Sequence, residues 1–282
     1  MEARRRTWFD DRGLVIGGAP DRRVPFYAGA MHYWRVDPAR WRACLRAIHD
    51  LGLTLVETYV PWRVHEPEAG EELWGGRRDL ARFLDAAAAE GLGVVLRPGP
   101  HINAELTSFG FPDWVLADPE VQARTARGTP AWMPAPPRAF PIPSYASAAF
   151  HAHVRRWYEA VAAVVAPYLG DPVVAIGVDN EAQMFFRAGA YDLDYHPDAL
   201  AWWREWGGLD DPPRAWHASD AKRCVEWVTF KDAYIARALG DFAHMLDEVG
   251  LGEVARFHNL PPGHHGLYDL RPIQRALGGP VA

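Results

Sequence analysis

The stretch "VVAIGVDNEA" at residues 173–182 joins a buried-strand pattern to a polar end. Residues 173–178 are small or β-branched and apolar, which is typical of a strand covered on both faces. Asp179, Asn180 and Glu181 follow directly. We interpret this polar end as directed into a pocket, although the same residues could cap the next helix or pair with an arginine.

Similar apolar runs recur along the chain and alternate with helical patterns. Strands of this kind, separated by helices, predict a parallel sheet with helices on both faces. The strands are expected at 24–33, 53–62, 92–100, 172–180 and 254–262, with the opening of a sixth at 278–282. The helices are expected at about 37–52, 77–91, 147–168, 198–206, 219–249 and 270–277, with a Pro-rich loop at 128–144.

Two architectures fit this order, an open doubly wound sheet and a closed barrel. No strand is followed by G-x-G-x-x-G or G-x-x-x-x-G-K-[ST], the nucleotide-binding sequences of open sheets. Polar and aromatic residues gather instead where strands end, which in a barrel is the face that carries the active site. We therefore predict an α/β protein with a (β/α)8 TIM barrel, truncated after about five to six strands. Residues 1–282 form this one catalytic domain, with a lead-in at 1–23.

The composition excludes several classes of function. The chain has 282 residues, 49% hydrophobic residues, a formal net charge of −6 and no basic block beyond Arg4 to Arg6, so we expect no nucleic-acid partner. Cys44 and Cys224 are too few for a disulfide framework. The absence of a long apolar run and of a signal-peptide pattern predicts no membrane association and a cytoplasmic location. The 13 tryptophans, each of which could simply pack in the core, suit sugar binding as a set.

The polar strand ends supply the groups that glycoside hydrolysis requires. In that reaction one carboxylic acid protonates the leaving oxygen, and a second carboxylate attacks the sugar or activates water. The chain offers carboxylates, flanking amides and aromatic platforms, without metal-ligand spacing or a phosphate motif. This combination favours a glycosidase that uses no metal.

Four longer stretches carry a more specific pattern: "AGAMHYWRVDPARW" (28–41), "GLTLVETYVPWRVHEPEAG" (52–70), "DLARFLDAAAAEGLGVVLRPGPHINAE" (79–105) and "VVAIGVDNEA" (173–182). In this order and spacing they resemble the signatures of glycoside hydrolase family 35, the β-galactosidases. The resemblance covers residues 7–185. It implies a (β/α)8 catalytic barrel, retaining hydrolysis of terminal β-linked galactose from an oligosaccharide or glycoconjugate, no cofactor, and β-rich domains after the barrel.

The same resemblance assigns roles to individual residues. Glu181 matches the general acid/base of the family, and Asn180 matches the amide that holds the sugar 2-hydroxyl. Tyr59 matches a tyrosine that contacts galactose, while Ala104 and Glu105 match a pair whose backbone and carboxylate hold sugar hydroxyls. No metal ligands are implied.

The chain departs from the family pattern around these positions. Asn103 stands where the family usually has cysteine, Leu106 replaces a tryptophan, and Ala182-Gln183 replaces Tyr-Gly. These changes alter the expected shape of the sugar subsite, so galactose and related sugars both stay open.

Other acidic and histidine residues near strand ends receive structural interpretations. We expect Glu57 to face a neighbouring strand or helix and Glu66 to hold a loop. His32, His101 and His258 could touch substrate or could be buried and hydrogen-bonded, and they do not have metal-ligand spacing.

The nucleophilic glutamate of the family lies on the seventh barrel strand, and no glutamate follows Glu253 in this chain. We therefore expect the nucleophile to be absent and the chain to be a fragment, associated with a missing C-terminal half or with copies of itself. Two alternatives stay open. One is a catalytically inactive galactoside-binding barrel; the other is an unrelated isomerase or aldolase, for which Lys222 and Lys231 are poorly placed on the long helix.

Overall fold

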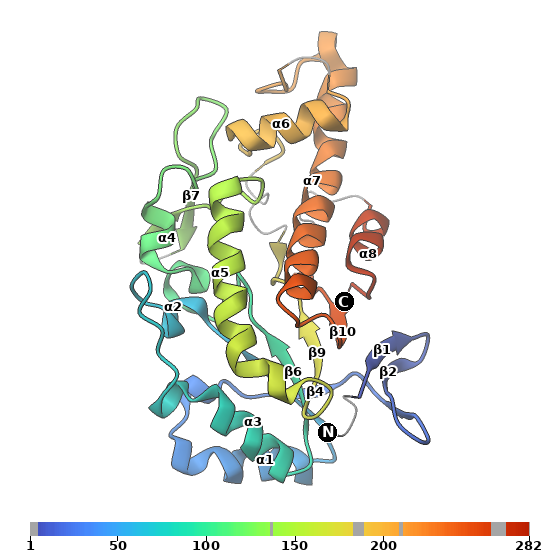
Figure 1. The fold of residues 1–282 in the computed structure, drawn as a ribbon. Coiled ribbons are helices and arrows are strands. Elements are labelled where there is room, and N and C mark those ends of the chain that lie inside the picture. Colours follow the sequence, from blue (N-terminus) through green and yellow to red (C-terminus); the bar gives the residue numbers. More distant parts are fainter. Residues whose placement is uncertain (1–4, 136–137, 183–188, 209–210, 261–268, 282) are drawn as a thin grey trace.

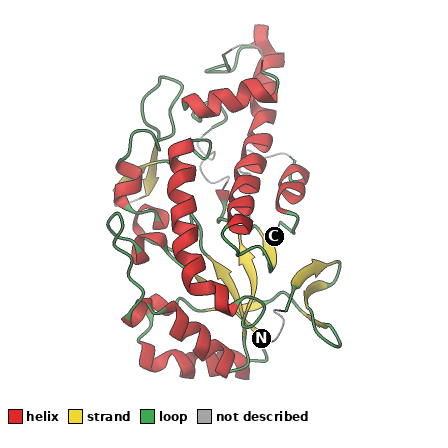
Figure 2. Cartoon of the chain, viewed as in Figure 1, coloured by secondary structure: helices red, strands yellow, loops and turns green. Residues whose placement is uncertain are grey.

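Five parallel strands form one sheet in the order β10-β9-β6-β5-β4 in the computed structural model (Figures 1 and 2). The structure describes residues 5–135, 138–182, 189–208, 211–260 and 269–281. The strands of this sheet are β4 (Ala28–Ala30), β5 (Leu55–Tyr59), β6 (Gly93–Arg97), β9 (Val173–Gly177) and β10 (Ala255–Phe257). Each of the five lies within a predicted strand, and each neighbouring pair is parallel.

Helices connect the strands in the predicted alternation. Short α2 (Trp62–His65) and α4 (Asp113–Ala117) lie in the connections after β5 and β6. The longer helices are α1 (Trp41–Asp50), α3 (Leu80–Ala89), α5 (Ala148–Val165), α6 (Pro197–Trp206), α7 (Ala221–Glu248) and α8 (Arg271–Leu277).

Local sequence explains where these helices begin and which face they bury. The Asp79 carboxylate caps α3 by accepting from the Arg82 N–H at 3.0 Å, and the Ser147 hydroxyl caps α5 by accepting from the Phe150 N–H at 3.1 Å. On the buried face of α5, Trp157 and Tyr158 donate to the Pro98 and Gly99 carbonyls after β6. These two bonds fix α5 against the carboxyl end of that strand.

The sixth strand begins as the sequence predicts. Val281 forms an isolated parallel bridge with His258, directly after β10. The His258 N–H also donates to the Pro280 carbonyl at 3.2 Å. A sixth segment therefore continues the sheet beyond β10 in the direction that a barrel requires.

The lead-in forms a small sheet that its sequence pattern did not predict. It forms an antiparallel sheet of β1 (Thr7–Asp10), β2 (Gly13–Ile16) and β3 (Arg22–Val24). The Thr7 hydroxyl donates to the Val174 carbonyl of β9 at 2.7 Å and accepts from the Ala255 N–H of β10 at 2.8 Å. Apolar side chains from both sheets share one small core: Leu14, Ile16, Val24, Leu55, Val95, Val174, Ala175, Ala255 and Phe257.

The Pro-rich segment at 128–144 was expected to be a loop. The structure corrects this expectation, because part of the segment forms strands. It contains the antiparallel pair β7 (Trp132–Ala135) and β8 (Arg138–Pro141). Pro134 and Pro141 are tolerated because a two-stranded ribbon has only edge strands, where a missing N–H can face solvent. Proline content therefore hid this hairpin.

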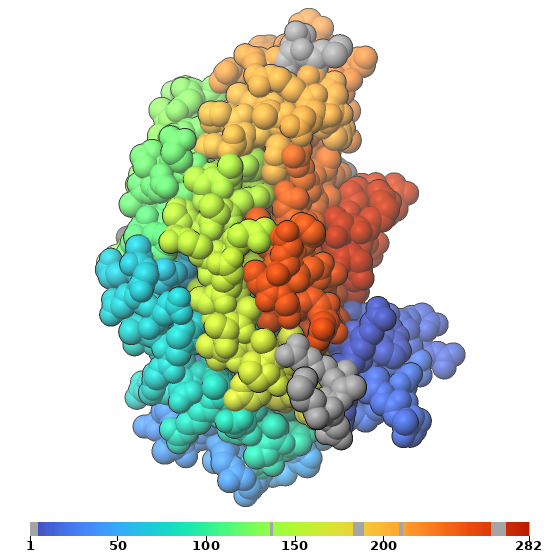
Figure 3. Space-filling model, in the orientation of Figure 1, coloured from blue at the N-terminus to red at the C-terminus, as the bar shows by residue number. Residues whose placement is uncertain are grey.

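The molecule is longest along the axis of α7 (Figure 3). The light-blue residues around α1 lie at one end, and the orange residues of α6 and the start of α7 lie at the other. None of the helices in the described ranges has the length and hydropathy needed to cross a membrane.

Candidate active site

Side chains from neighbouring strands meet at the carboxyl edge of the sheet. Tyr59 ends β5, Arg97 ends β6, Asn180 follows β9, and Asn259 follows β10. The strands are parallel and adjacent, so their ends share one edge and these side chains come within contact. We call these four residues the Asn180 group.

Arg97 is the centre of the Asn180 group. Its side chain is 6% exposed, and its guanidinium donates to Glu57 Oε1 at 2.8 Å and to Asn180 Oδ1 at 2.7 Å. It also contacts Asn259 Oδ1 and lies 4.8 Å from the ring centroid of Tyr59. The planar fork of arginine can hold several acceptors at once, so one side chain links strands β5, β6, β9 and β10.

The amide of Asn180 is held by its oxygen. The Tyr59 hydroxyl donates to Asn180 Oδ1 at 3.1 Å, in addition to the bond from Arg97. Burial raises the pKa of Tyr59, which keeps this hydroxyl protonated as a donor. Both side-chain hydrogen bonds described for Asn180 end on Oδ1, which leaves Nδ2 with two N–H donors to offer a ligand.

Asp179 turns away from the edge into the wall. It is fully buried, and its carboxylate accepts from the His101 N–H at 2.8 Å and the Tyr145 hydroxyl at 2.9 Å. Burial raises the pKa of Asp179 to about 7, although both hydrogen bonds oppose the shift. Asp179 is thus a structural group whose charge changes near neutral pH.

Glu181 occupies a different environment two residues later. It is partly exposed, and its N–H donates to the Asn259 carbonyl at 3.2 Å. The alternating conformation of Asp179, Asn180 and Glu181 lets one carboxylate enter the wall while the other stays accessible to solvent. Asp179 and Glu181 have positive φ angles of 57° and 47°.

Left-handed backbone is concentrated around the candidate site. Within the described ranges, the non-glycine residues with positive φ follow either β6 or β9. Each costs about 1 kcal/mol or more relative to the usual helical or extended regions. Such strain is concentrated at functional sites, which supports a functional role for these two strand ends. The residues are Asn103, Ala104, Glu105, Ser108, Phe109, Asp179 and Glu181.

Arg35 contacts both Ala104 and Glu105. The Arg35 guanidinium contacts the Ala104 carbonyl and lies 3.7 Å from the Glu105 carboxylate. The Glu105 side chain is 86% exposed, and no hydrogen bond described here joins it to the Asn180 group. The structure therefore brings Tyr59 and Asn180 together, while Ala104 and Glu105 lie on a neighbouring loop.

Residues 14–212 match the family described as glycosyl hydrolases family 35. The chain belongs to glycosyl hydrolase family 35. The matched range includes Tyr59 and Asn180 of the Asn180 group.

Curated relatives of this family 35 chain carry two kinds of name. "Beta-galactosidase-1-like protein" of Mus musculus is 35% identical over 186 residues, which are 64% of this chain and 25% of the relative. "Exo-beta-D-glucosaminidase" of Pyrococcus horikoshii is 35% identical over 170 residues, 57% of this chain and 21% of the relative. The family 35 chain thus spans about a quarter of the length of these relatives.

Solved structures confirm the fold of the family 35 chain. A β-galactosidase from the psychrophilic Marinomonas ef1 has a TM-score of 0.68 at 17% identity, covering 90% of this chain and 40% of that one. A β-galactosidase from the Antarctic haloarchaeon Halorubrum lacusprofundi has a TM-score of 0.67 at 17% identity, covering 88% and 38%. The sheet and its helices are consistent with part of an α/β barrel, as predicted.

The histidines divide into two buried residues and one at the site. His101 and His258 are fully buried, and each Nδ1–H donates to a backbone carbonyl, that of Asn180 and that of Val178. Burial lowers the pKa of His101 to about 3 and of His258 to about 4, so both are neutral. His32 is partly buried beside Tyr59, with ring centroids 5.3 Å apart, and its Nδ1 has no hydrogen-bond partner in the described ranges.

Both structural predictions for the other glutamates are confirmed. Glu57 faces Arg97 of the neighbouring strand. Glu66 holds its own loop by accepting from the Trp62 indole N–H at 2.7 Å and the Gly70 N–H at 2.8 Å. These contacts give both glutamates a structural role.

Arg97 is a residue of the candidate site that the sequence pattern did not single out. It stands within "LRPGP", a stretch quoted for its family pattern, and an arginine after four apolar residues of a buried strand was itself a signal. A cation at such a position must be paired in the folded protein. The partners could not be named because Asn180 and Asn259 are distant in sequence.

The described ranges do not bring three or more His, Cys, Asp or Glu side chains together as a metal-binding group.

The two lysines, Lys222 and Lys231, lie on α7, as predicted. Lys231 is buried with its ammonium beside the Leu193 carbonyl and 3.8 Å from the Trp227 ring centroid. Family membership removes the alternative of an unrelated aldolase or isomerase.

Proposed function

We propose that residues 1–282 are part of one catalytic barrel of a retaining glycosidase that removes terminal β-linked galactose. Glu181 is its general acid/base. The observation that carries this proposal is the geometry of Asn180, whose oxygen is fixed by Tyr59 and Arg97 beside the accessible Glu181. A clamped amide next to a carboxylate suits a sugar hydroxyl next to a bond that is to be protonated.

Two proton transfers follow from this role. Glu181 gives its proton to the glycosidic oxygen while the bond from the anomeric carbon to that oxygen breaks. As that bond breaks, a second carboxylate bonds to the anomeric carbon. The Glu181 carboxylate then takes a proton from the water that attacks this carbon and displaces the second carboxylate, so Glu181 returns to its starting state. An N–H of Asn180 Nδ2 can donate to the 2-hydroxyl and so hold the sugar beside Glu181.

The second carboxylate is proposed to come from outside residues 1–282. A retaining mechanism requires two carboxyl groups about 5–5.5 Å apart across the anomeric carbon. Glu57 is paired with Arg97, and Asp179 is buried in the wall, so neither is placed for attack. A further part of the protein or an associated chain would supply the nucleophile.

The Asn180 geometry favours galactose over glucosamine, the sugar in the names of some relatives. Because Oδ1 is occupied, Nδ2 presents donors to the sugar at position 2. A 2-hydroxyl can accept such a bond, whereas the protonated 2-amino group of a glucosaminide can only donate. Ala104 and Glu105 are proposed to hold other hydroxyls of the same sugar, after a movement of their exposed loop.

The proposed acid/base role is tested by varying the leaving group. In the complete protein encoded with this chain, Glu181→Gln should lower kcat/KM for methyl β-galactoside by about a thousandfold, because this leaving group needs a proton. For 2,4-dinitrophenyl β-galactoside the first step should change far less. Glu71→Gln, an exposed glutamate outside the site, is the matched control.

Three results would contradict parts of the proposal. Equal losses for both leaving groups would remove the acid role of Glu181. Faster turnover of nitrophenyl β-glucosaminide than of the β-galactoside would reverse the sugar assignment. Turnover by residues 1–282 alone that requires Glu181 would show that the second carboxylate lies within them.

A catalytically inactive galactoside-binding barrel is the second candidate. The clamped Asn180 favours it equally, because binding needs only the amide and its neighbours. Calorimetry that detects galactose binding to the complete protein, with no turnover of any nitrophenyl galactoside, would select this candidate.

A further inference from the structure

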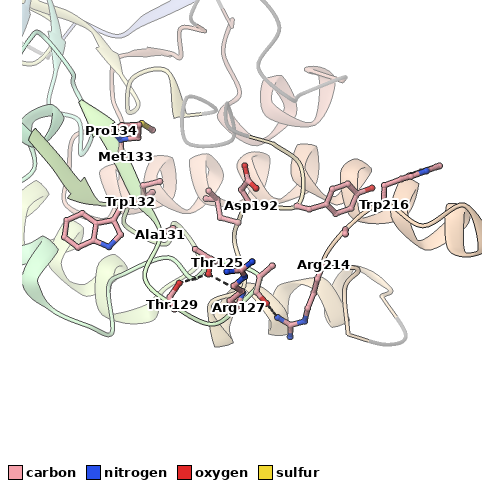
Figure 4. Close-up of a pocket in the computed structure, with 15 residues that line it drawn as sticks. Thr125, Arg127, Thr129, Ala131, Trp132, Met133, Pro134, Asp192, Arg214 and Trp216 are labelled. Atoms are coloured by element: carbon pink, nitrogen blue, oxygen red, sulfur yellow. Dashed lines mark hydrogen bonds between the residues drawn. The ribbon is translucent and has the colours of Figure 1, made fainter. Parts of the chain in front are cut away.

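A pocket whose lining includes no member of the Asn180 group lies beside the hairpin β7–β8. Its volume is about 930 Å³, which is in the range of small-molecule sites. Figure 4 shows Trp132 and Trp216 at opposite ends of it. Between these tryptophans lie Thr125, Arg127, Thr129 and Asp192.

Three loops that are distant in sequence form this pocket, and hydrogen bonds tie them together. The Tyr195 N–H donates to the Arg124 carbonyl at 2.9 Å, and its hydroxyl donates to the Pro213 carbonyl at 2.8 Å. Arg214 contacts the Ala126 carbonyl and lies 5.4 Å from the Tyr195 ring centroid. Tyr195 is itself buried, so it fixes the other two loops from below.

The loop that carries Arg127 is closed by its own bonds. The Thr125 N–H donates to the Thr129 carbonyl at 2.8 Å, and the two threonine hydroxyls lie 2.8 Å apart. The Arg127 N–H donates to the Thr125 hydroxyl at 3.2 Å. The pocket is therefore preformed, and binding there would not have to order this loop.

The lining combines aromatic surface with opposite charges. Trp132 is 57% exposed and Trp216 is 55% exposed, whereas six of the thirteen tryptophans are buried in the core. Arg127 and Asp192 are also exposed, and no ion pair involving either is described among the residues of known placement. Large exposed indoles beside unpaired polar groups are typical of a binding site.

We infer that this pocket binds a neutral saccharide, as a carbohydrate site distinct from the Asn180 group. Sugar rings have apolar C–H faces that can pack on indole rings, and hydroxyls that both donate and accept. Asp192 can accept from such hydroxyls, while Arg127 can donate to them. Arg214 also lines the pocket, but its guanidinium contacts the Ala126 carbonyl. Arg127 and Asp192 therefore offer a ligand one charge of each sign, which suits a neutral polar ligand, whereas a purely apolar one would leave both charges unsolvated.

The choice of sugar rests on the proposed function, whereas the pocket itself does not. A linear β-1,4-galactotetraose is the probe, because it is long enough to reach more than one aromatic residue. We would titrate it by calorimetry into the complete protein carrying Asn180→Ala, which removes the main contact of the terminal-sugar site. Trp132→Ala and Trp216→Ala in this background should each raise Kd about tenfold.

Two controls separate binding from folding. Trp8→Ala changes a partly exposed tryptophan of the lead-in, 37% exposed and outside the pocket, and should leave Kd unchanged. Arg127→Ala changes an exposed side chain on the self-closed loop and should raise Kd about threefold without altering the unfolding midpoint. Loss of binding in both tryptophan variants and in Arg127→Ala, with Trp8→Ala unaffected, supports the inference.

Several outcomes would overturn it. One is tetraose binding with the same Kd in all three pocket variants. Another is protection of Trp132 and Trp216 from acrylamide quenching in the complete protein without sugar, since the pocket would then be a protein interface. The proposed function has a separate readout: if Glu181→Gln kept full hydrolysis while the pocket variants lost tetraose binding, only that function would fall.

Discussion

The Asn180 group and the aromatic pocket are two different ways of presenting polar groups to a ligand. In the Asn180 group, a buried arginine holds side chains from adjacent strands, and each of these residues has little freedom. In the pocket, the indoles and charges are exposed, and the bonds that organise them lie underneath, between loops. The first arrangement orients a few atoms, whereas the second offers area.

This difference bears on what each region can do. Chemistry at one bond requires donors and acids fixed to within a fraction of an ångström, and strand ends of a packed sheet provide that. Retention of a flexible sugar chain needs stacking surface and adaptable hydroxyl contacts, which loops provide. Four substitutions, from the largest expected effect to the smallest, test whether the two regions differ in this way.

Arg97→Met should have the largest effect. It leaves the Glu57 carboxylate and the Asn180 and Asn259 oxygens without their shared cation, so the free energy of unfolding should fall by about 3–5 kcal/mol. Urea unfolding measures the change. Arg23→Met, which removes the exposed partner of Asp10, should change the midpoint little. Similar midpoints for the two variants would mean that Arg97 does not organise the group.

Asn180→Asp should distinguish the role of the amide oxygen, which accepts hydrogen bonds, from the role of the amide nitrogen, which donates them. The aspartate keeps oxygens that accept from Tyr59 and Arg97, so the free energy of unfolding should be preserved. It loses the N–H donors, and kcat/KM for galactosides in the complete protein should fall about a hundredfold. Asn180→Ala should lower both stability and activity. If the aspartate variant stayed fully active, Nδ2 would have no role at the sugar.

Asp179→Asn should change how stability depends on pH. The pKa of Asp179 is raised from 3.8 to about 7 by burial, so between about pH 4 and 7 the folded protein keeps a proton that the unfolded chain releases. Stability from this group is complete below pH 4 and is lost as pH rises to 7, by at most about 1.4 kcal/mol per pH unit.

Asparagine has no such proton, so Asp179→Asn should lack this part of the slope. Urea unfolding at pH 5, 6 and 7 measures it. Asp11→Asn, at an exposed position of the lead-in, is the control. A variant with the wild-type slope would show that Asp179 does not titrate in the wall.

Tyr195→Phe should have the smallest effect and should act on the pocket alone. It removes the hydroxyl bond to the Pro213 carbonyl, which costs about 1 kcal/mol of stability. The ring under Arg214 stays, so the Kd for galactotetraose should rise only about two- to threefold by loosening of the loop. Hydrolysis of small nitrophenyl galactosides should not change. A parallel loss of hydrolysis would mean that the two regions act as one site.

Much of the strand-end site could be predicted because it is encoded locally. The polar end of 173–182 marks a strand that stops at an edge, and this prediction is confirmed for the strand. The proximity of Tyr59 and Asn180 followed once the strands were taken as parallel neighbours. The lead-in sheet and the hairpin β7–β8 were missed, because their pairing depends on partners and their prolines mask strand propensity.

The sequence by itself determined which segments become the strands of the parallel sheet and the longer helices, since apolar periodicity reports burial directly. It also determined which polar residues stand at the strand ends. Only the tertiary structure decided that Arg97 would join Glu57, Asn180 and Asn259, and that Trp132 and Trp216 would face one pocket. These contacts join residues far apart in the chain, and no local pattern specifies a partner that the fold brings into reach.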